Sequence, residues 1–296
     1  MHLAVDCVGI NDGGGATVAL DFLQAALRDR RIERLTVFSS PLDVLTIVYP
    51  TDPKLHVIIQ PRAYASRLSR LAWQVRQLGT ACRHHGADRL LCLANAGEAP
   101  PGLPCATFIQ QSLPFSPEAL ATLSTRRRLE MLILRRMMRR SCRRAQRVLV
   151  QTDVMARWLA AAFDLPAPKV SVIEPAAPSP GSAPPSPLLA AMRAASPGLR
   201  LLYVGSDAPY KMVSTLIHSL PLVQARLPGV QLFLTLPTEH AVHHPPDVTC
   251  LGYLAPAALY EAYRLASVLL MPSLVETVGL PMLEAFSVGT PVVAAD

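Results

Sequence analysis

Residues 267–296 read SVLLMPSLVETVGLPMLEAFSVGTPVVAAD. The stretch divides into a short apolar run, a loop, a segment of helical period and a second apolar run. We expect a strand at 267–271, a helix at 281–288 and a strand at 291–295, with Pro281 in the first helical turn, where proline is well tolerated. A helix between two short buried strands is the connection that parallel strands require. The stretch therefore predicts a parallel α/β sheet.

The same alternation of apolar runs and helical segments continues through the rest of the chain. In the first half we expect strands at 3–9, 34–39, 55–60, 88–93, 105–110, 147–151 and 169–174, and helices at 16–29, 64–85, 117–146 and 153–163. In the second half we expect further strands at 200–205, 230–236 and 248–252 and helices at 211–226 and 256–266. This order indicates an α/β fold with two Rossmann-like, doubly wound parallel sheets.

A proline-rich segment separates the two halves. Between Glu174 and Pro197, seven prolines stand among alanine, serine and glycine, a composition that cannot continue a helix or a central strand. We predict a first domain at 1–174, a linker at 175–198 and a second, incomplete domain at 199–296. The chain has 296 residues, 51% of them hydrophobic, which is enough material for two buried cores.

The cysteines and the N-terminus indicate a cellular compartment. Six cysteines lie far apart, at positions 7, 82, 92, 105, 142 and 250, and no pair has the spacing of a zinc ribbon or a redox motif. We therefore expect reduced thiols in the cores and no metal site. The chain does not open with a basic segment followed by an apolar one, and no apolar run is long enough to cross a bilayer. We expect a cytoplasmic protein, or one peripheral to the inner face of a membrane.

The net charge of +7 comes mainly from arginine, since only three of the 28 basic residues are lysines. Ten arginines lie between Arg126 and Arg147, and from Arg135 onward they fall at helical spacing with apolar residues between them. Three interpretations stay open: a solvated helix face, contact with anionic lipid or a lipid-linked phosphorylated acceptor, and nucleic acid. Because no aromatic residues interleave with the arginines to stack bases, nucleic acid is not predicted as a partner. The candidate membrane contacts are Arg135, Arg136, Arg139, Arg140 and Arg143.

Ligands of open α/β sheets bind at the carboxyl ends of the strands, so the loops there carry the candidate sites. The first loop, Asn11-Asp12-Gly13-Gly14-Gly15, follows a strand and opens a helix. Gly13, Gly14 and Gly15 let a ligand approach the backbone, and a helix N-terminus favours an anion such as a diphosphate. The loop lacks the full Gly-x-Gly-x-x-Gly dinucleotide pattern, and a tight turn without a ligand stays an alternative.

The second loop runs from Gly205 to Lys211 at the start of the second domain. A lysine between a strand and a helix can place a point charge on a phosphate oxygen. A surface lysine near a helix start is the alternative interpretation.

The third loop carries Glu276, and Gly279 and Leu280 lead from it into a helix that contains Glu284. Seven residues stand between the two glutamates, and such a pair of carboxylates could be mistaken for the acid–base pair of a glycosidase. One lies in the loop and the other on the helix, beside the N–H groups of the helix N-terminus. This placement favours the binding of hydroxyls around a phosphate. A favourable interaction with the helix dipole would explain one glutamate alone.

Residues 272–296 closely resemble the Glu-x7-Glu signature of family 4 glycosyltransferases. The glycine loop, residues 146–152, Tyr203-Val204-Gly205 with Lys211, and Gly252-Tyr253-Leu254 follow in the family's order. The resemblance implies the two-domain GT-B fold and transfer of a sugar from a nucleoside diphosphate donor to an acceptor hydroxyl with retention. It implies no cofactor and no bound metal. The acceptor expected from it is a saccharide or a lipid-linked molecule, as in the assembly of cell-surface polysaccharide or glycolipid.

The resemblance also implies roles for individual residues. Glu284 would hold the ribose hydroxyls of the nucleotide, Glu276 would contact a hydroxyl of the donor sugar, and Lys211 would neutralise the diphosphate. Lys211 and Glu276 are therefore the candidate catalytic residues. The donor-binding set is completed by Gly13, Gly14, Gly15, Gly205, Gly279 and Leu280.

The sequence departs from the family pattern at several points. Ser206 stands where many members have an arginine, and Gln110 stands where many have a histidine. A glutamine can hydrogen-bond a sugar but cannot take its proton, so Gln110 is a candidate donor or acceptor contact only. Family members continue beyond the equivalent of Asp296, and we expect this chain to be a fragment or a shortened paralogue with little activity alone. The alternatives are an inactive homologue that binds nucleotide without turnover, and another GT-B enzyme such as a sugar-nucleotide epimerase.

Overall fold

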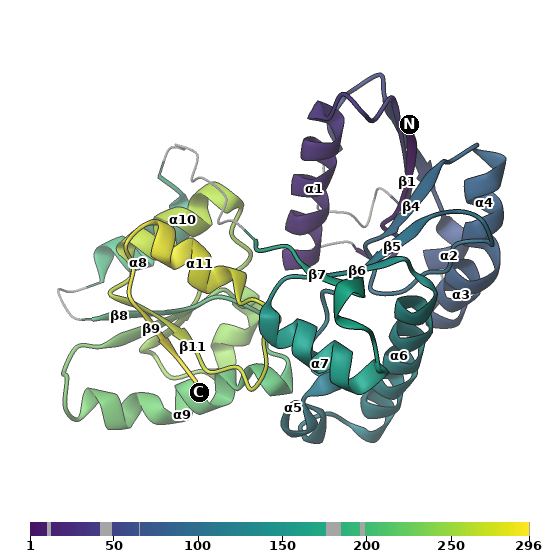
Figure 1. Cartoon of the computed structure of the whole chain (residues 1–296). Coiled ribbons are helices and arrows are strands. Elements are labelled where there is room, and N and C mark those ends of the chain that lie inside the picture. Colours follow the sequence, from purple (N-terminus) through teal and green to yellow (C-terminus); the bar gives the residue numbers. More distant parts are fainter. Residues whose placement is uncertain (11–12, 42–48, 65, 176–184, 196–198, 296) are drawn as a thin grey trace. The chain divides into compact units, whose positions relative to one another are not determined.

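The computed structural model describes the chain except residues 11–12, 42–48, 65, 176–184, 196–198 and 296 (Figure 1). The chain divides into two compact units. Unit 1 comprises Met1–Phe115 and Leu129–Pro175, and unit 2 comprises Ser116–Arg128 and Ala176–Asp296. Each unit is built on one parallel sheet, which confirms the predicted α/β fold class.

The sheet of unit 1 has seven strands in the order β3-β2-β1-β4-β5-β6-β7, and all neighbouring strands are parallel. The strands are β1 (His2–Asp6), β2 (Arg34–Ser39), β3 (Leu55–Ile59), β4 (Arg89–Cys92), β5 (Cys105–Phe108), β6 (Arg147–Val150) and β7 (Val170–Val172). All seven lie within or next to the ranges predicted from the sequence. The strand order reverses direction between β1 and β4, so the loops after these two strands leave the sheet side by side.

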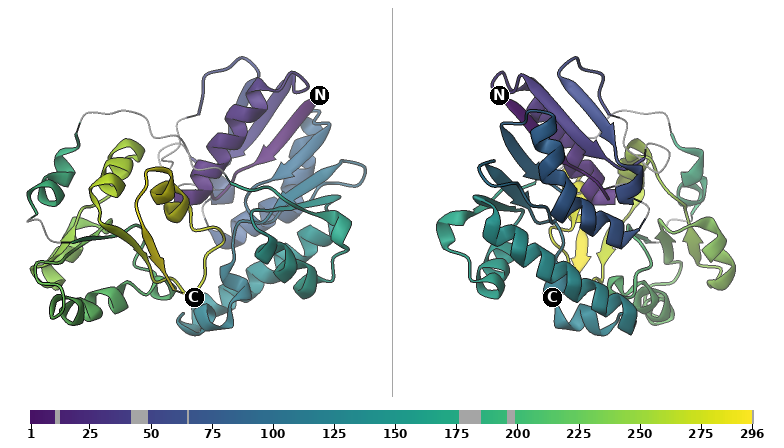
Figure 2. Two further views of the ribbon diagram at one scale, coloured as in Figure 1. Left: turned by 60° about the vertical axis from the view of Figure 1, so that its left-hand side comes forward. Right: turned by 90° about the vertical axis from the view of Figure 1, so that its right-hand side faces the viewer.

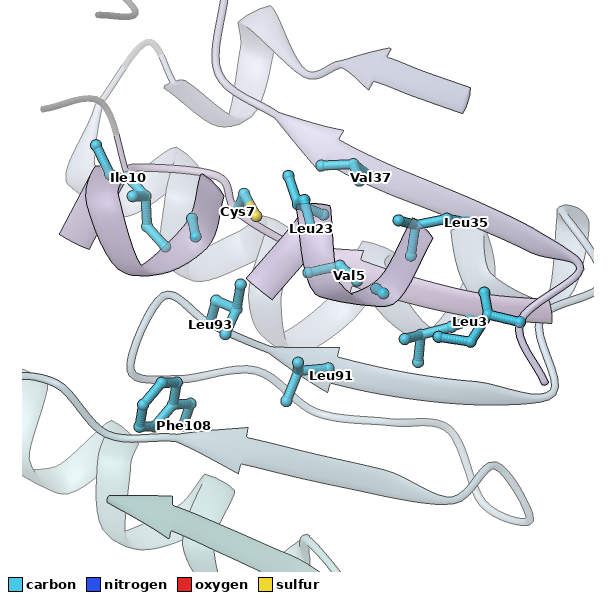
Figure 3. Packing of buried hydrophobic residues seen from close by; sticks show 14 residues of the cluster. Leu3, Val5, Cys7, Ile10, Leu23, Leu35, Val37, Leu91, Leu93 and Phe108 are labelled. Carbon is cyan, nitrogen blue, oxygen red and sulfur yellow. The ribbon is translucent and has the colours of Figure 1, made fainter. Parts of the chain in front are cut away.

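Helix α1 (Gly13–Arg28) covers part of this sheet with one apolar face. Its Leu23 is fully buried and belongs to the same apolar cluster as Val5 of β1 and Leu35 of β2 (Figure 3). A second cluster packs Trp73 and Leu78 against other residues of the same strands, among them Ala4. Alternate residues of β1 thus point to opposite faces of the sheet, as in a strand that is buried on both sides.

Two segments predicted as single helices are broken in the structure. Residues 64–85 form the end of α2 (Pro61–Tyr64), then α3 (Arg67–Ala72), a π-helical turn η2 (Trp73–Gln77) and α4 (Leu78–His84). Ser66 starts α3 because its hydroxyl accepts a hydrogen bond from the Ser69 N–H at 3.0 Å. The prediction of one continuous helix was wrong here because it followed the apolar period and gave no weight to this cap.

The arginine-rich segment is also divided, into α5 (Pro117–Ala121) and α6 (Thr125–Arg144). The Ser124 hydroxyl accepts from the Arg127 N–H at 3.4 Å. The Arg128 guanidinium donates to the carbonyl oxygens of Leu120, Ala121 and Leu123, which lie at the end of α5. Side-chain hydrogen bonds therefore satisfy the backbone groups that a continuous helix would have paired.

Helix α7 (Asp153–Phe163) has the bounds predicted for it. The Thr152 hydroxyl accepts from the Met155 N–H at 3.2 Å, and Asp164 ends the helix in the left-handed conformation at φ +55°. Its buried residues Met155, Leu159 and Phe163 pack with Met138 and Cys142 of α6. The inward face of α6 is thus fixed by a neighbouring helix as well as by the sheet.

The sheet of unit 2 has five parallel strands in the order β10-β9-β8-β11-β12. They are β8 (Arg200–Tyr203), β9 (Gln231–Leu234), β10 (Val248–Cys250), β11 (Val268–Met271) and β12 (Val292–Ala294). Helices α10 (Pro256–Leu265) and α11 (Leu280–Ser287) lie on one face of the sheet and α9 (Val213–Gln224) lies on the other (Figures 1 and 2). The two faces have separate apolar clusters, with Tyr260 and Tyr263 in the first and Val213 and Leu220 in the second.

Part of the segment predicted as a linker is helical. Residues Pro187–Leu189 form a 3-10 turn and Ala190–Ala194 form α8. Leu189 and Met192 are fully buried in the apolar cluster of α10, and Glu261 accepts from the Ser186 N–H at 2.8 Å. The linker was predicted from the number of prolines, and this criterion missed a short apolar segment that belongs to the core of unit 2. The rest of the predicted linker lies largely outside the described residues.

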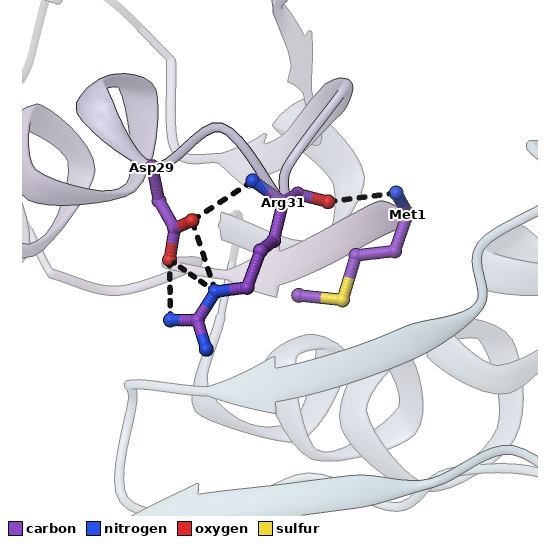
Figure 4. A network of polar contacts seen from close by, with 3 residues as sticks. All are labelled: Met1, Asp29 and Arg31. Carbon is purple, nitrogen blue, oxygen red and sulfur yellow. Dashed lines mark hydrogen bonds and ion pairs between the residues drawn. The ribbon is translucent and has the colours of Figure 1, made fainter.

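The first residue of the chain is tied to the loop after α1. The Met1 ammonium donates to the Arg31 carbonyl at 2.8 Å, while the Arg31 guanidinium binds the Asp29 carboxylate (Figure 4). These hydrogen bonds lower the pKa of Asp29 to about 2.

The six cysteines are all buried, and none forms a disulfide. Burial raises the pKa of the Cys82 and Cys142 thiols to about 12.

One buried acid, Asp6, lies at the carboxyl end of β1. Its Oδ1 accepts from the Trp73 indole N–H at 3.1 Å and from the Val8 N–H at 3.3 Å, whereas its Oδ2 is buried without a hydrogen-bond partner in the described structure. Burial raises the pKa of Asp6 to about 6. The carboxylate form is thus less favourable in the folded chain than in the unfolded one.

We expect Asp6→Asn to change how stability depends on pH. In the wild type, the contribution of Asp6 to the free energy of unfolding should be greatest below pH 4 and fall until about pH 6, because the folded chain holds the Asp6 proton more tightly than the unfolded chain. A shift of roughly two pKa units corresponds to on the order of 2–3 kcal/mol. Urea unfolding between pH 3.5 and pH 8 should show that Asp6→Asn removes most of this slope. Glu33→Gln, at a side chain that is 83% exposed, is the control and should keep it.

Candidate functional site

The candidate site lies at the carboxyl edge of the second sheet, where its strand order reverses. Strand β8 has β9 on one side and β11 on the other. The loop after β8 and the loop after β11 therefore leave the sheet next to each other. In open α/β sheets this switch point is where ligands bind.

The two loops are joined directly. The loop after β8 contains a 3-10 turn, Pro209–Lys211, and the loop after β11 contains Glu276. The Lys211 ammonium donates to Glu276 Oε1 at 2.5 Å, and the two side chains are 18% and 25% exposed. The backbone adds a second link, since the Leu274 N–H donates to the Tyr210 carbonyl at 2.9 Å. Lys211 and Glu276, the two candidate catalytic residues of the sequence analysis, thus form an ion pair in the structure.

The backbone of Gly205 turns sharply after β8. Gly205 has φ +154°, and a Cβ atom there would lie 2.7 Å from the Tyr203 hydroxyl oxygen. That hydroxyl donates to the Ser206 carbonyl at 2.6 Å. Burial, together with the nearby negative charge of Glu276, raises the pKa of Tyr203, so its hydroxyl keeps the proton that it donates. Glycine is required because the turn leaves no room for a side chain.

Helix α11 begins at the same edge. Gly279 precedes it in the left-handed conformation at φ +73°, and Pro281 stands in its first turn. The Met282 N–H donates to the Gly279 carbonyl at 2.8 Å, so the N–H groups of Gly279 and Leu280 precede the first hydrogen bond of the helix and lie at the positive end of its dipole. Gly279 and Leu280 thus offer backbone donors next to the loop that carries Glu276.

Glu284 lies one turn farther along α11 and is held by a tyrosine. The Tyr263 hydroxyl of α10 donates to Glu284 Oε2 at 2.7 Å, and the Tyr263 carbonyl accepts from the Thr290 hydroxyl at 2.8 Å. Burial raises the pKa of Glu284, while the hydrogen bond from Tyr263 acts in the opposite direction. The carboxylate is therefore partly desolvated and fixed in one orientation.

Sequence reasoning missed Tyr263. Its ring is fully buried in the core of unit 2, which agrees with its place in the apolar period of α10. The partner of its hydroxyl is 21 residues away on another helix, so no local pattern indicated the contact.

The remaining predicted donor and acceptor residues lie in unit 1. Gly13 begins α1 at φ +60°, and Gly13 and Gly14 are exposed, whereas Asn11 and Asp12 lie outside the described residues. The Gln110 amide donates to the Leu93 carbonyl at 3.0 Å. The donor group of Gln110 thus supports the loop after β4. The roles of Gly13–Gly15 and of Gln110 in ligand binding stay predictions.

The structure separates the five predicted membrane-contact arginines into two groups. Arg140 forms an ion pair with the buried Glu98, which Arg144 also contacts. Arg143 Nε donates to the Phe163 carbonyl at 3.3 Å, and the Arg135 guanidinium lies 5.5 Å from the centre of the Phe115 ring. Arg136 and Arg139 are exposed. Three of the five thus bind other parts of unit 1, and membrane contact by the five arginines stays a prediction.

Metal sites and membrane-spanning helices can be assessed only for the part of the chain that the structure describes. No group of three or more His, Cys, Asp or Glu side chains there has the arrangement of a metal site. Within the same residues, no helix combines the length and the apolar character that crossing a membrane would need.

Comparisons with known proteins agree with this architecture. Residues 198–296 match the family model described as "Glycosyl transferases group 1". Comparison of the sequence with curated proteins gave no match.

Three solved structures illustrate the likeness in fold. WaaG, "a glycosyltransferase involved in lipopolysaccharide biosynthesis", has a TM-score of 0.70 at 17% identity, over 98% of this chain and 80% of that chain. Sucrose-phosphate synthase from Thermosynechococcus elongatus has a TM-score of 0.70 at 17% identity, and the match covers 99% of this chain and 81% of that chain. Anabaena Alr3699/HepE in complex with UDP and glucose has a TM-score of 0.64 at 15% identity, and the match covers 100% of this chain and 81% of that chain. The chain thus has the two-domain GT-B fold of glycosyltransferases, and its second domain matches the group 1 glycosyl transferase model.

Proposed function

We propose that the chain is a retaining glycosyltransferase of family 4, which moves a hexose from a nucleoside diphosphate sugar to an acceptor hydroxyl. The observation that carries the proposal is the Lys211–Glu276 ion pair at the switch point of the second sheet, beside the N-terminus of α11. A cation, a carboxylate and free backbone donors at one sheet edge match the diphosphate and the hydroxyls of such a donor. The match of residues 198–296 to the group 1 model supports the same chemistry.

Lys211 would stabilise the leaving diphosphate. Its charge is paired with that of Glu276, so a bound diphosphate would have to take over this contact. Charge grows on the diphosphate as the bond to the sugar breaks, and a cation fixed in advance lowers the free energy of that state. The N–H groups of Gly279 and Leu280 would act in the same direction through the dipole of α11. No covalent nucleophile is part of this proposal.

Glu276 and Glu284 would divide the recognition of hydroxyl groups. Once Lys211 turns to the diphosphate, Glu276 can accept hydrogen bonds from the transferred sugar. Glu284, fixed through Oε2 by Tyr263, has its other oxygen and further lone pairs for the ribose hydroxyls. A carboxylate held in one position binds two neighbouring hydroxyls at a smaller entropic cost than a mobile one.

The finer identity of the substrates is also part of the proposal. We propose a uridine nucleotide as donor, because UDP or UDP-glucose occupies the Anabaena relative with the same fold. For the acceptor we propose a saccharide or a lipid-linked molecule, on the cytoplasmic side of a membrane. The reaction would then belong to the assembly of cell-surface polysaccharide or glycolipid, which fits the role named for WaaG. We propose that no cofactor or metal takes part.

A second candidate is an inactive homologue that binds nucleotide without turnover. The observation that favours it is Ser206, whose position in the loop after β8 supplies no second cation beside Lys211. Nucleotide binding without transfer to any acceptor would support this candidate over the first.

Replacement of the site lysine should weaken nucleotide binding. We expect Lys211→Met to weaken the binding of UDP at least tenfold, because a charge-assisted hydrogen bond to a phosphate contributes roughly 1.5–3 kcal/mol. Calorimetric titration of UDP and GDP into the purified chain measures this. Lys54→Met, at a lysine that bonds the Leu27 carbonyl in unit 1, is the control and should bind as the wild type does. A folded wild-type chain that binds neither nucleotide would contradict the proposed function.

Removal of the Tyr263 hydroxyl should weaken recognition of the ribose. We expect Tyr263→Phe to lose roughly 5- to 10-fold in affinity for UDP but little for 2′,3′-dideoxy-UDP, because only the former needs a positioned Glu284. Tyr260→Phe on the same helix, with its ring centre 6.0 Å from that of Tyr263, controls for the loss of a core hydroxyl. Equal losses for both ligands would mean that Tyr263 acts on stability alone.

A further inference from the structure

Arg70 of α3 places a guanidinium group at the carboxyl edge of the sheet of unit 1. A Cβ atom at Gly9, in the loop after β1, would lie 2.5 Å from Arg70 Cζ. The Gly9 N–H donates to the hydroxyl of Ser40, which directly follows β2, at 2.9 Å. The guanidinium thus packs on the backbone of the loop after β1, and Gly9, at φ +94°, leaves room for it that a side chain would fill.

This guanidinium has no acceptor among the described residues. The Nε of Arg70 is buried without a hydrogen-bond partner, and no hydrogen bond or ion pair joins its terminal nitrogens to a described residue. Arg200 in unit 2 differs in this respect. Its Nε is also buried and unpartnered, but its terminal nitrogens donate to the carbonyl oxygens of Leu265 and Ala195 at 3.2 and 3.5 Å. Arg70 is therefore held by packing and not by hydrogen bonds of its side chain.

The buried acid Asp6 does not supply the missing acceptor. Its Oδ1 accepts from the indole N–H of Trp73, which follows Arg70 by three residues. Burial raises the pKa of Asp6 to about 6, and the charge of Arg70 is one of the influences in the opposite direction, so the two groups interact electrostatically. Both Asp6 Oδ2 and Arg70 Nε nevertheless stay without a hydrogen-bond partner in the described structure. The donor groups of Arg70 are thus available to a ligand.

The chemistry of a guanidinium indicates the class of that ligand. Its N–H donors lie in one plane and match two oxygen atoms of a carboxylate or a phosphate. The loop after β1 also leaves the sheet at the point where the strand order reverses, between β1 and β4, which is where ligands of open α/β sheets bind. In the proposed function the donor site lies in unit 2, so this edge of unit 1 can serve the second substrate.

We propose that Arg70 binds an acidic group, a phosphate or a carboxylate, on the acceptor. This inference rests on the proposed function and deepens it, because it names the chemical class of the acceptor: a sugar phosphate, a polyol phosphate or an acidic sugar. The oxyanion supplies the acceptor atoms that Arg70 lacks. Packing against Gly9 fixes the guanidinium beforehand, so that little side-chain entropy is lost on binding.

Three small polyols that differ in one group test the proposal. Glycerol 3-phosphate carries a phosphate, glycerate carries a carboxylate and glycerol carries neither. In NMR titrations of the 15N-labelled whole chain, we expect at least one of the two anions to shift the signals of the Gly9 amide and the Arg70 Nε–H, and glycerol to shift neither. The anion that binds more tightly identifies the acidic group.

Two variants of Arg70 separate recognition from folding. Arg70→Gln should weaken binding of the anion roughly tenfold or more, because it removes charge-assisted hydrogen bonds. Arg70→Lys keeps a positive charge near Asp6 but loses the planar fork, and it should still weaken binding by roughly threefold or more. Arg62→Gln, at an exposed arginine of α2, is the matched control and should bind the anion as the wild type does.

Titration of UDP distinguishes this inference from the proposed function. Arg70→Gln should bind UDP as the wild type does, since the donor site lies in unit 2. Absence of anion binding to a chain that still binds UDP would overturn the inference alone. Equal weakening by Arg62→Gln would also overturn it, because the anion would then respond only to the basic charge of the chain. Anion binding at Arg70 by a chain that binds no UDP would contradict the proposed function, and the acceptor role of Arg70 with it.

Discussion

The parallel pairing of β8 with β11 is the contact on which the candidate site depends. Leu201 and Leu202 pair with Val268 and Leu269, although the two strands are 67 residues apart in sequence. Because both strands run in the same direction, their following loops leave at one edge, and Lys211 meets Glu276 there. Every other feature of the site is arranged around this edge. Tyr263 and Glu284 approach it from the helices that cover one face of the sheet.

The ion pair also sets the electrostatics of the candidate site. Lys211 and Glu276 are both mostly buried, so neither charge is well solvated without the other. In the proposed function, a diphosphate would compete for Lys211 and release Glu276, which would then need a new hydrogen-bond donor. A sugar linked to the diphosphate would supply hydroxyl donors a short distance from the phosphate. The proposal thus implies preference for a ligand that carries both groups over a free phosphate, because only the former would satisfy both charges at once.

The sequence predicted the strands well and the helix breaks poorly, for a physical reason. A strand buried on both faces is a continuous apolar run, and runs such as 200–205 and 267–271 leave little choice of register or type. The break after α5 depends instead on Arg128 reaching three carbonyl groups, and the start of α3 depends on one serine hydroxyl. The candidate residues of the loops could be proposed from the sequence because they follow predicted strands directly, where ligands of open α/β sheets bind. Tyr263 was not found, because its chemistry depends on a tertiary contact to a side chain that only the fold brings near.

Helix α6 illustrates how one repeated residue type can have two separate functions. Its arginines are equivalent in the sequence pattern, yet Glu98, which precedes the helix by more than 25 residues, neutralises two of them. That buried carboxylate requires cationic partners, since an unpaired charge in the core would be strongly destabilising. Arg136 and Arg139 are exposed, and Arg140 and Arg144 are themselves more than half exposed although they pair with Glu98. The neutralisation of a buried carboxylate and an exposed basic surface thus belong to the same stretch of one helix, because a long arginine side chain can reach a buried partner from a position that solvent still contacts.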